Sequence, residues 1–319
     1  MTGGDLRIGL AGLGQHGLRY AAHLLNGDVD GARLTAVHRR DRAAGRDWAS
    51  DRGVAFEPDL ESLAARNDVD ALIAALPPTL HPRAVQAAAS QRKAILVEKP
   101  LAPSAPQARR AVDAAAAAAI PAMVAQTMRF DSTVRGLVAA LPRIGAIHMV
   151  TVSHRFEPTG RAWLDDPAEG GLVSNTGIHG IDLLRHITGG EIAEIAGIGG
   201  RVVLEHADDV FAGILRLEPG GIVATIDNSR ATGSRSGRIE VIGERGQLLA
   251  DHVTSSLVLA VERSRQLIEL PPPVPTVREA LRAFAAAVTS GNPVPIPLEE
   301  GLAAVEAVDR LRSAIEAGP

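Results

Sequence analysis

Several residue types and patterns are missing from this 319-residue chain. It has no cysteine, which excludes disulfides and thiolate metal sites. It has no run of 18 apolar residues and no charged-then-apolar start, so we expect neither a membrane span nor a signal segment. The net charge of −4 offers no basic field for nucleic acid. Hydrophobic residues make up 46% of the chain, enough for a full core. We therefore expect a soluble, cytoplasmic protein of one large or two ordinary domains.

A glycine-rich turn follows a predicted strand at 7–11 and precedes a predicted helix at 18–25. Gly12, Gly14 and Gly17 give the spacing G-x-G-x-x-G. The first glycine allows a sharp turn, the second lets backbone N–H groups approach a pyrophosphate, and the third lets helix and strand pack closely. The N-terminus of the helix also favours negative charge. The stretch predicts a dinucleotide site; a glycine turn without a ligand is the alternative.

Apolar strands alternate with helices over the first 124 residues. Such alternation indicates parallel strands joined by right-handed crossovers. The run 71–76 is continuously apolar, as expected of a strand covered on both faces. Residues 1–124 are therefore predicted to form a doubly wound Rossmann domain of the α/β class, with ligands at the C-terminal ends of its strands. Further strands are expected at 33–38, 94–97 and 121–125.

The pattern changes after residue 129. Most of the later strands alternate apolar and polar residues between Gly and Pro turns, which predicts an open, mostly antiparallel sheet. Residues 125–319 are predicted to be an α+β domain for substrate binding and oligomerisation. Its helices are expected at 132–141, 178–187, 277–290 and 298–316, and its strands at 147–156, 194–205, 210–217, 222–228, 238–242, 247–251, 257–261 and 266–270.

Lys99 lies just past the end of the predicted buried strand 94–97, and Pro100 ends the strand. A lysine at such a strand end can hold a substrate oxygen as a hydrogen-bond donor. Its pKa can also fall there far enough to help move protons. A surface pair of Glu98 and Lys99 is the alternative interpretation.

A second candidate group lies at the start of the predicted helix 178–187. Asn175 and His179 are four residues apart and can share a helix face. Asp182, three residues further, could orient the histidine ring. Histidine is the usual group for taking a hydroxyl proton near neutral pH. A histidine in a satisfied packing role is the alternative.

Five motifs follow one another along the chain. They are the glycine turn, Pro77-Pro78-Thr79-Leu80-His81, Glu98-Lys99-Pro100, Arg129-Phe130 and Gly170-Gly171…Asn175-x-Gly177-x-His179-x-x-Asp182. In order and spacing these motifs resemble the glucose–fructose oxidoreductase / inositol dehydrogenase family (Gfo/Idh/MocA) over nearly the whole chain.

The resemblance implies a Rossmann domain followed by a domain with a large open sheet, and hydride transfer between a nicotinamide and a sugar or polyol carbon. It also implies that Lys99 and His179 carry proton transfer, with Asn175 as the third catalytic candidate. The family usually has Asp at the position of Asn175, although some members that act on nucleotide-linked sugars have Asn.

The cofactor is predicted to be NADP in preference to NAD. An acidic residue for the ribose 2′-hydroxyl is expected just after the second strand, and the chain has Arg39 and Arg40 there. Two cations suit a 2′-phosphate. In the alternative, Asp41 takes the ribose. The residues assigned to the cofactor are Gly12, Gly14, Gln15, His16, Gly17, Arg39, Arg40, Leu76, Pro77, His81, Glu98 and Lys99.

A small sugar-like molecule is the expected substrate, with no nucleic acid or membrane as partner. The resemblance adds Arg155 and Trp163 to Asn175 and His179 as substrate-binding residues. The remaining histidines lack ligand spacing, so no metal is predicted. An exposed apolar sheet face predicts a homodimer or homotetramer. Two other functions stay open: a redox-neutral lyase or glycosidase with tightly bound nicotinamide cofactor, and a non-catalytic NAD(P)-binding sensor.

Overall fold

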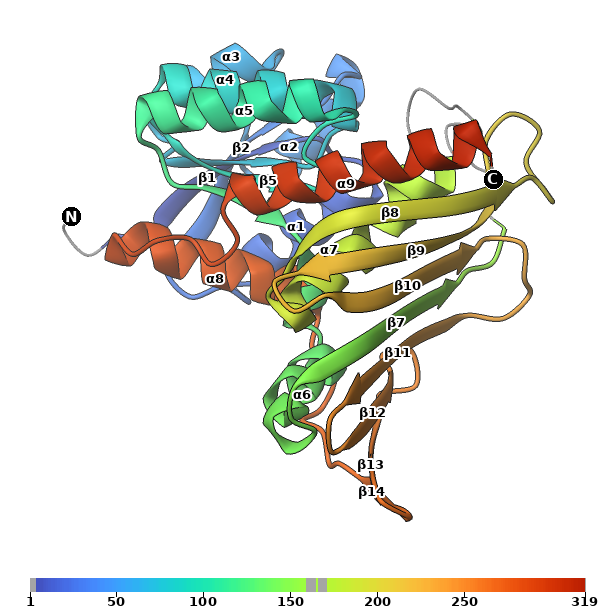
Figure 1. The fold of residues 1–319 in the computed structure, drawn as a ribbon. Coiled ribbons are helices and arrows are strands. Elements are labelled where there is room, and N and C mark those ends of the chain that lie inside the picture. The colour runs from blue at the N-terminus through green and yellow to red at the C-terminus, as the bar shows by residue number, and fades with distance from the viewer. Residues whose placement is uncertain (1–3, 159–164, 166–170, 319) are drawn as a thin grey trace. The chain divides into compact units, whose positions relative to one another are not determined.

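The computed structural model describes residues 4–158, 165 and 171–318. The chain divides into two compact units (Figure 1). Unit 1 comprises Met1–Thr127 and Pro275–Ala303, and unit 2 comprises Met128–Val274 and Ala304–Pro319. No helix in the part of the chain described here is long and apolar enough to cross a membrane.

Unit 1 is built on a parallel six-stranded sheet with the order β3-β2-β1-β4-β5-β6, which confirms the predicted Rossmann fold. The order reverses between β1 and β4, the position where doubly wound folds bind ligands. Strands β4 and β5 are buried throughout because helices cover both faces. The strands are β1 (Leu6–Ala11), β2 (Ala32–His38), β3 (Ala55–Glu57), β4 (Ala71–Ala74), β5 (Ala94–Glu98) and β6 (Ala122–Ala125). The helices are α1 (Gln15–Leu25), α2 (Arg42–Ser50), α3 (Leu60–Ala65), α4 (His81–Ser90), α5 (Ala105–Ala118) and α8 (Thr276–Ser290).

The domain boundary differs from the prediction at one place. The first segment of unit 1 ends near the predicted residue 124, but residues 275–303 pack with the Rossmann sheet rather than with the second domain. The Val124 N–H donates to the Ile296 carbonyl at 3.0 Å, next to a bridge between Met123 and Pro297. Helix α8 is amphipathic and buries its apolar face in this unit. A sequence pattern shows that such a face needs a partner but does not show which one.

Unit 2 contains an eight-stranded sheet with the order β14-β13-β12-β11-β7-β10-β9-β8. All neighbouring pairs are antiparallel except β7 and β10, so the predicted mostly antiparallel sheet is confirmed. The predicted strand 194–205 instead runs from 191 to 200. The strands are β7 (Ile147–Arg155), β8 (Glu191–Gly200), β9 (Val210–Glu218), β10 (Ile222–Ser229), β11 (Ser236–Gly243), β12 (Gly246–Asp251), β13 (Ser256–Val261) and β14 (Ser264–Leu267). The helices are α6 (Ser132–Ala140), the π-helix η5 (Val173–Gly177), α7 (Ile178–Thr188) and α9 (Leu298–Ala317), whose first residues belong to unit 1.

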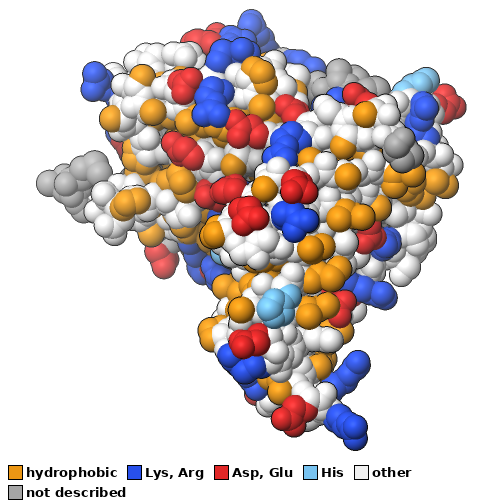
Figure 2. All heavy atoms as spheres, in the orientation of Figure 1, with side chains coloured by type: hydrophobic (Ala, Val, Ile, Leu, Met, Phe, Trp, Pro, Cys, Tyr) orange, Lys and Arg blue, Asp and Glu red, His pale blue; other side chains and the backbone are white. Residues whose placement is uncertain are grey.

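The two faces of this sheet differ. On the inner face, Gly180 of α7 lies against Val152 and Ile226, and α9 packs on β8 and β9 through Leu311. On the outer face, Ile198 is 60% exposed and Ile214 is 64% exposed. Figure 2 shows hydrophobic side chains with charged ones between them over these strands. The period-two alternation therefore yields one covered and one open face.

Candidate active site

The glycine turn between β1 and α1 has the geometry that its spacing predicts. Gly12 has a φ of +100°, and a Cβ there would lie 2.2 Å from the Ala75 carbonyl oxygen. A Cβ on Gly17 would lie 1.9 Å from the Gly12 carbonyl oxygen. Gly14 is the N-cap of α1. Apart from its chain neighbours and the backbone of α1, no atom of the residues that the structure describes lies within 4 Å of its Cβ position. The turn therefore leaves an open cradle at a helix N-terminus that fits a pyrophosphate, with Gln15 and His16 exposed beside it.

The end of β2 presents two arginines. Arg39 is half-buried and Arg40 is exposed. Asp41, the alternative ribose ligand, is the N-cap of α2, and its carboxylate accepts the Ala44 N–H at 3.1 Å. The acidic group at this strand end thus already has a structural partner in the helix that follows.

Lys99 follows β5 in a turn that is anchored from two helices. The Tyr20 hydroxyl of α1 donates to Glu98 Oε1 at 2.8 Å. The other oxygen of Glu98 accepts the Lys99 N–H at 3.1 Å. His81, at the start of α4, is fully buried, and its Nδ1 lies 2.8 Å from the Pro100 carbonyl oxygen. Lys99 is therefore held at the C-terminal edge of the parallel sheet.

The same edge carries the residues after β4. Leu76 is half-buried and Pro77 is exposed, and Leu76 lies beside Gly12, 3.3 Å from its Cβ position. Burial lowers the pKa of His81, so its ring stays neutral and can donate one N–H to the Pro100 carbonyl. The structure thus brings the glycine turn, the end of β4 and the Lys99 turn to one edge of unit 1.

In unit 2, Asn175 lies in η5 and His179 in the first turn of α7, and both are half-buried. The sequence predicts an α-helical start here, whereas the structure has a π-helix with i→i+5 bonds. The Thr176 hydroxyl donates to the Leu172 carbonyl at 3.0 Å and lies 3.2 Å from the Asn228 amide of β10. Short π-helical turns often occur at functional sites.

Asp182 forms an ion pair with Arg129 that its place in the sequence does not predict. Arg129 donates from Nε to both carboxylate oxygens at 3.0 and 3.1 Å, and from Nη2 to Oδ1 at 2.6 Å. Asp182 is 1% exposed and Arg129 is 11% exposed. This pair ties the segment after β6 to α7. The Arg129-Phe130 motif was the one available signal for it.

The structure does not bring Arg155 together with His179. Arg155 ends β7 and pairs with Asp227, which lies on the outer face of the sheet. Helix α7 packs on the inner face, against Val152. Trp163, the other predicted substrate residue, and Gly170 lie outside the described residues.

His154, which has no ligand spacing in the sequence, lies on the inner face of the sheet at the end of β7. It is 1% exposed, and its ring centroid lies 5.3 Å from that of His252. Within residues 4–158, 165 and 171–318, neither of its ring nitrogens has a hydrogen-bond partner. In the same ranges, no group of three or more His, Asp or Glu side chains could hold a metal ion.

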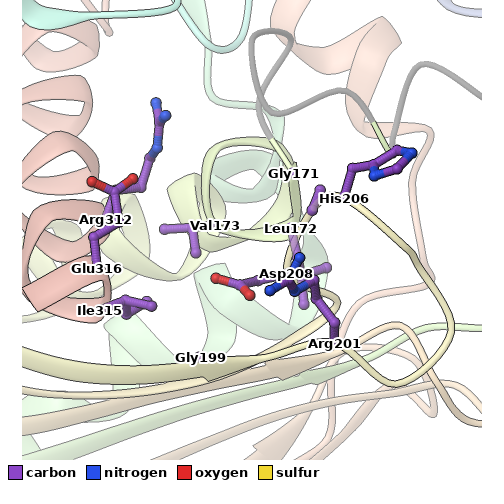
Figure 3. Close-up of a pocket in the computed structure, with 11 residues that line it drawn as sticks. Gly171, Leu172, Val173, Gly199, Arg201, His206, Asp208, Arg312, Ile315 and Glu316 are labelled. Atoms are coloured by element: carbon purple, nitrogen blue, oxygen red, sulfur yellow. The ribbon is translucent and has the colours of Figure 1, made fainter. Parts of the chain in front are cut away.

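A hollow of 360 Å³ lies in unit 2 beside the start of η5 (Figure 3). The carboxylate of Asp208 points into it, and Glu316, Arg201 and Arg312 are among the other residues that line it. Asn175 and His179 are not among its lining residues. Its charges are of both signs, so its chemistry selects no one class of ligand.

Comparison with known proteins identifies the family. The model described as "Oxidoreductase family, NAD-binding Rossmann fold" matches residues 6–126, and the GFO/IDH/MocA C-terminal domain matches residues 132–249. The chain belongs to this family and is a nicotinamide-dependent oxidoreductase, as the motifs predict.

Two curated relatives match nearly the whole chain. Myo-inositol 2-dehydrogenase of Thermotoga maritima is 30% identical over 93% of this chain and 92% of its own length. The scyllo-inositol 2-dehydrogenase (NAD(+)) of Bacillus subtilis is 26% identical over 94% and 93%. A crystal structure of an oxidoreductase from Agrobacterium radiobacter, in complex with NAD+, L-tartaric acid and magnesium, has a TM-score of 0.90 at 21% identity and covers 99% of this chain and 97% of that one. That last likeness is one of fold.

Proposed function

We propose that this protein transfers a hydride between NADP and a secondary alcohol or ketone of a polyol or sugar. The observation that carries the proposal is the anchored Lys99 turn, which shares a sheet edge with the open glycine cradle. Two relatives across almost the full chain are named inositol dehydrogenases, which supports a cyclic polyol or a sugar as substrate.

Each site residue has a defined part in this proposal. The bound nicotinamide supplies the hydride chemistry. Lys99 donates a hydrogen bond to the reacting oxygen, where charge develops as its proton moves. His179 takes that proton in oxidation and returns it in reduction. Asn175, neutral and half-buried, offers an amide for a hydroxyl of the substrate.

Replacing each of the two lysines by alanine, one at a time, tests the role assigned to Lys99. The chain contains only Lys93 and Lys99. Lys99→Ala is expected to lower kcat by roughly 10²-fold or more, the usual size of a lost acid–base or oxyanion contact. Its affinity for the cofactor should change little. Lys93→Ala is the control, because the Lys93 ammonium donates to the Arg66 carbonyl at 2.5 Å. Normal kcat with weakened cofactor binding in Lys99→Ala would place Lys99 outside the chemistry.

The residues after β2 support the proposed preference for NADP. Because Asp41 caps α2, Arg39 and Arg40 remain to meet the ribose, and a guanidinium grips a 2′-phosphate bidentately. Arg39→Ala should therefore weaken NADP binding much more than NAD binding in calorimetric titrations. Arg33→Ala, an exposed arginine of the same strand, is the control. Tighter binding of NAD by the unmodified protein would contradict the preference.

The open sheet face supports a homo-oligomer. Ile198, Ile214 and Val223 lie on the outer face of neighbouring strands. A shallow groove of 200 Å³ is lined there by Ile214, Val223, Glu194 and Arg216, among others. A second copy of the chain would remove this apolar surface from water. Light scattering should give a dimer or tetramer, and Ile214→Arg should lower that mass whereas Leu25→Arg on α1 should not. A monomer at micromolar concentration would contradict this part of the proposal.

A further inference from the structure

The only tyrosine of the chain lies inside the nucleotide-binding unit. Tyr20 is on α1, six residues after Gly14, and its side chain is fully buried. Its hydroxyl donates to Glu98 Oε1 at 2.8 Å, across 78 residues of sequence. A phenol is thereby placed between the helix that begins at the glycine cradle and the end of β5.

One carboxylate then connects this phenol to the backbone of Lys99. Glu98 is 7% exposed, and its second oxygen accepts the Lys99 N–H at 3.1 Å. On the other side of the turn, His81 holds the Pro100 carbonyl. Lys99 thus lies between two anchors, one from α1 and one from α4.

The hydrogen bond between Tyr20 and Glu98 joins a phenol to a buried carboxylate, and such bonds are stronger than those between neutral groups. Burial, together with the nearby Glu98 charge, raises the pKa of Tyr20 well above its ordinary value, so the phenol remains a donor. Hydrogen bonds to charged groups contribute more than neutral ones, and a buried oxygen that loses its donor is costly.

We propose that Tyr20 is a positioning residue for Lys99: through the Glu98 carboxylate it fixes the Lys99 turn relative to the helix whose first turn receives the cofactor phosphates. The proposal rests on the catalytic part assigned to Lys99 above. A displacement of about 1 Å at a reacting group can cost orders of magnitude in rate, so a remote hydroxyl can control turnover.

Tyr20→Phe removes this hydroxyl and keeps the ring. We expect kcat to fall roughly tenfold while the KM for cofactor stays within about twofold, because the ground-state contacts of the cofactor are unchanged. Thr35→Val is the matched control. It removes another buried hydroxyl of unit 1, one that donates to the Ile8 carbonyl at 3.2 Å, and should leave kcat unchanged.

A second measurement reports on the surroundings of the Lys99 amine directly and does not depend on turnover. With only two lysines in the chain, acetylation by a brief pulse of acetic anhydride can be read at each site by mass spectrometry. Tyr20→Phe should change the acetylation rate of Lys99 several-fold and leave that of Lys93 unchanged. In Thr35→Val both rates should match the unmodified protein.

The outcomes separate this inference from the proposed function. Lower kcat together with an altered Lys99 rate in Tyr20→Phe, both absent in Thr35→Val, supports the positioning role. An unaltered Lys99 rate, or equal losses of kcat in the two variants, overturns it. If Lys99→Ala keeps its activity, the proposed function fails, whereas the acetylation rates still report whether Tyr20 positions Lys99.

Discussion

We expect the buried pair of His154 and His252 in unit 2 to make the stability of the fold sensitive to acid. Burial, with smaller contributions from the nearby His252 and Arg155 and against the opposite effect of Asp251, lowers the pKa of His154 to about 3. Burial also lowers the pKa of His252. Because neither ring nitrogen of His154 has a hydrogen-bond partner within the described ranges, no hydrogen bond there would offset the cost of burying its charged form.

The size of the loss in the free energy of unfolding follows from the difference in proton binding between the folded and unfolded states. In the unfolded chain His154 has its ordinary pKa of about 6.5, so below that pH the unfolded state binds a proton that the folded state does not. The contribution of neutral His154 to the free energy of unfolding is therefore fully present above pH 6.5 and is lost as the pH falls towards 3. At about 1.4 kcal/mol per pH unit, the loss between pH 6.5 and pH 5 is about 2 kcal/mol. His252 acts in the same direction.

His154→Phe tests this reasoning, because it keeps an aromatic ring and removes the titrating nitrogens. Urea titrations at about pH 8 and about pH 5 give the free energy of unfolding, and the unmodified protein should lose about 2 kcal/mol more than the variant. His148→Phe, at an exposed position of the same strand, is the control. It should lose as much free energy of unfolding between about pH 8 and about pH 5 as the unmodified protein. Equal losses in the unmodified protein and His154→Phe would refute the argument.

Three further outcomes are expected. Asp182→Asn leaves the buried Arg129 with a neutral partner and should lower the free energy of unfolding by about 3 kcal/mol in urea titrations; a loss below about 1 kcal/mol, the value for exposed pairs, would contradict the buried pair's role. Gly17→Ala should reduce thermal stability because its Cβ meets a carbonyl oxygen, whereas Gly14→Ala should stay stable and lose cofactor affinity in calorimetry; equal stability of the two variants would oppose the assigned roles. Asn175→Asp should move the acidic limb of kcat/KM for oxidation upward by about one pH unit, because a carboxylate favours a protonated histidine nearby; an unmoved limb in an active variant would show that the two residues are not coupled.

The parts that sequence could predict are those where one local pattern determines the outcome. The glycine spacing predicts a turn that only glycine fits, and both Gly12 and Gly17 have carbonyl oxygens at their Cβ positions. The apolar run at 71–76 correctly predicts β4 as a buried central strand, although it ends at residue 74. Alternation correctly predicts a sheet with one open face.

The remaining features depend on contacts between distant segments. In the sequence, Tyr20 occupies a position of the amphipathic helix α1 where any large apolar residue would be expected. Its hydrogen-bond partner Glu98 lies 78 residues away. Arg129 and Asp182 are separated by 53 residues. The side chain of Arg155 lies on the outer face of the sheet because successive residues of β7 point to opposite faces. The resemblance to a family did not indicate which of the two faces Arg155 would occupy. Similarly, no local signal indicates that residues 275–303 join the first unit.

Net turnover of the cofactor tests the central claim most directly. The protein is mixed with oxidised NADP and, separately, each member of a panel of inositols and simple sugars, and the absorbance of the reduced nicotinamide is followed. We predict that at least one polyol or sugar gives reduced cofactor in equal amount to ketone product, and that Lys99→Ala and His179→Ala abolish the signal while both variants still bind cofactor. Consumption of a substrate without any net change in cofactor absorbance would contradict the account and indicate a redox-neutral reaction instead.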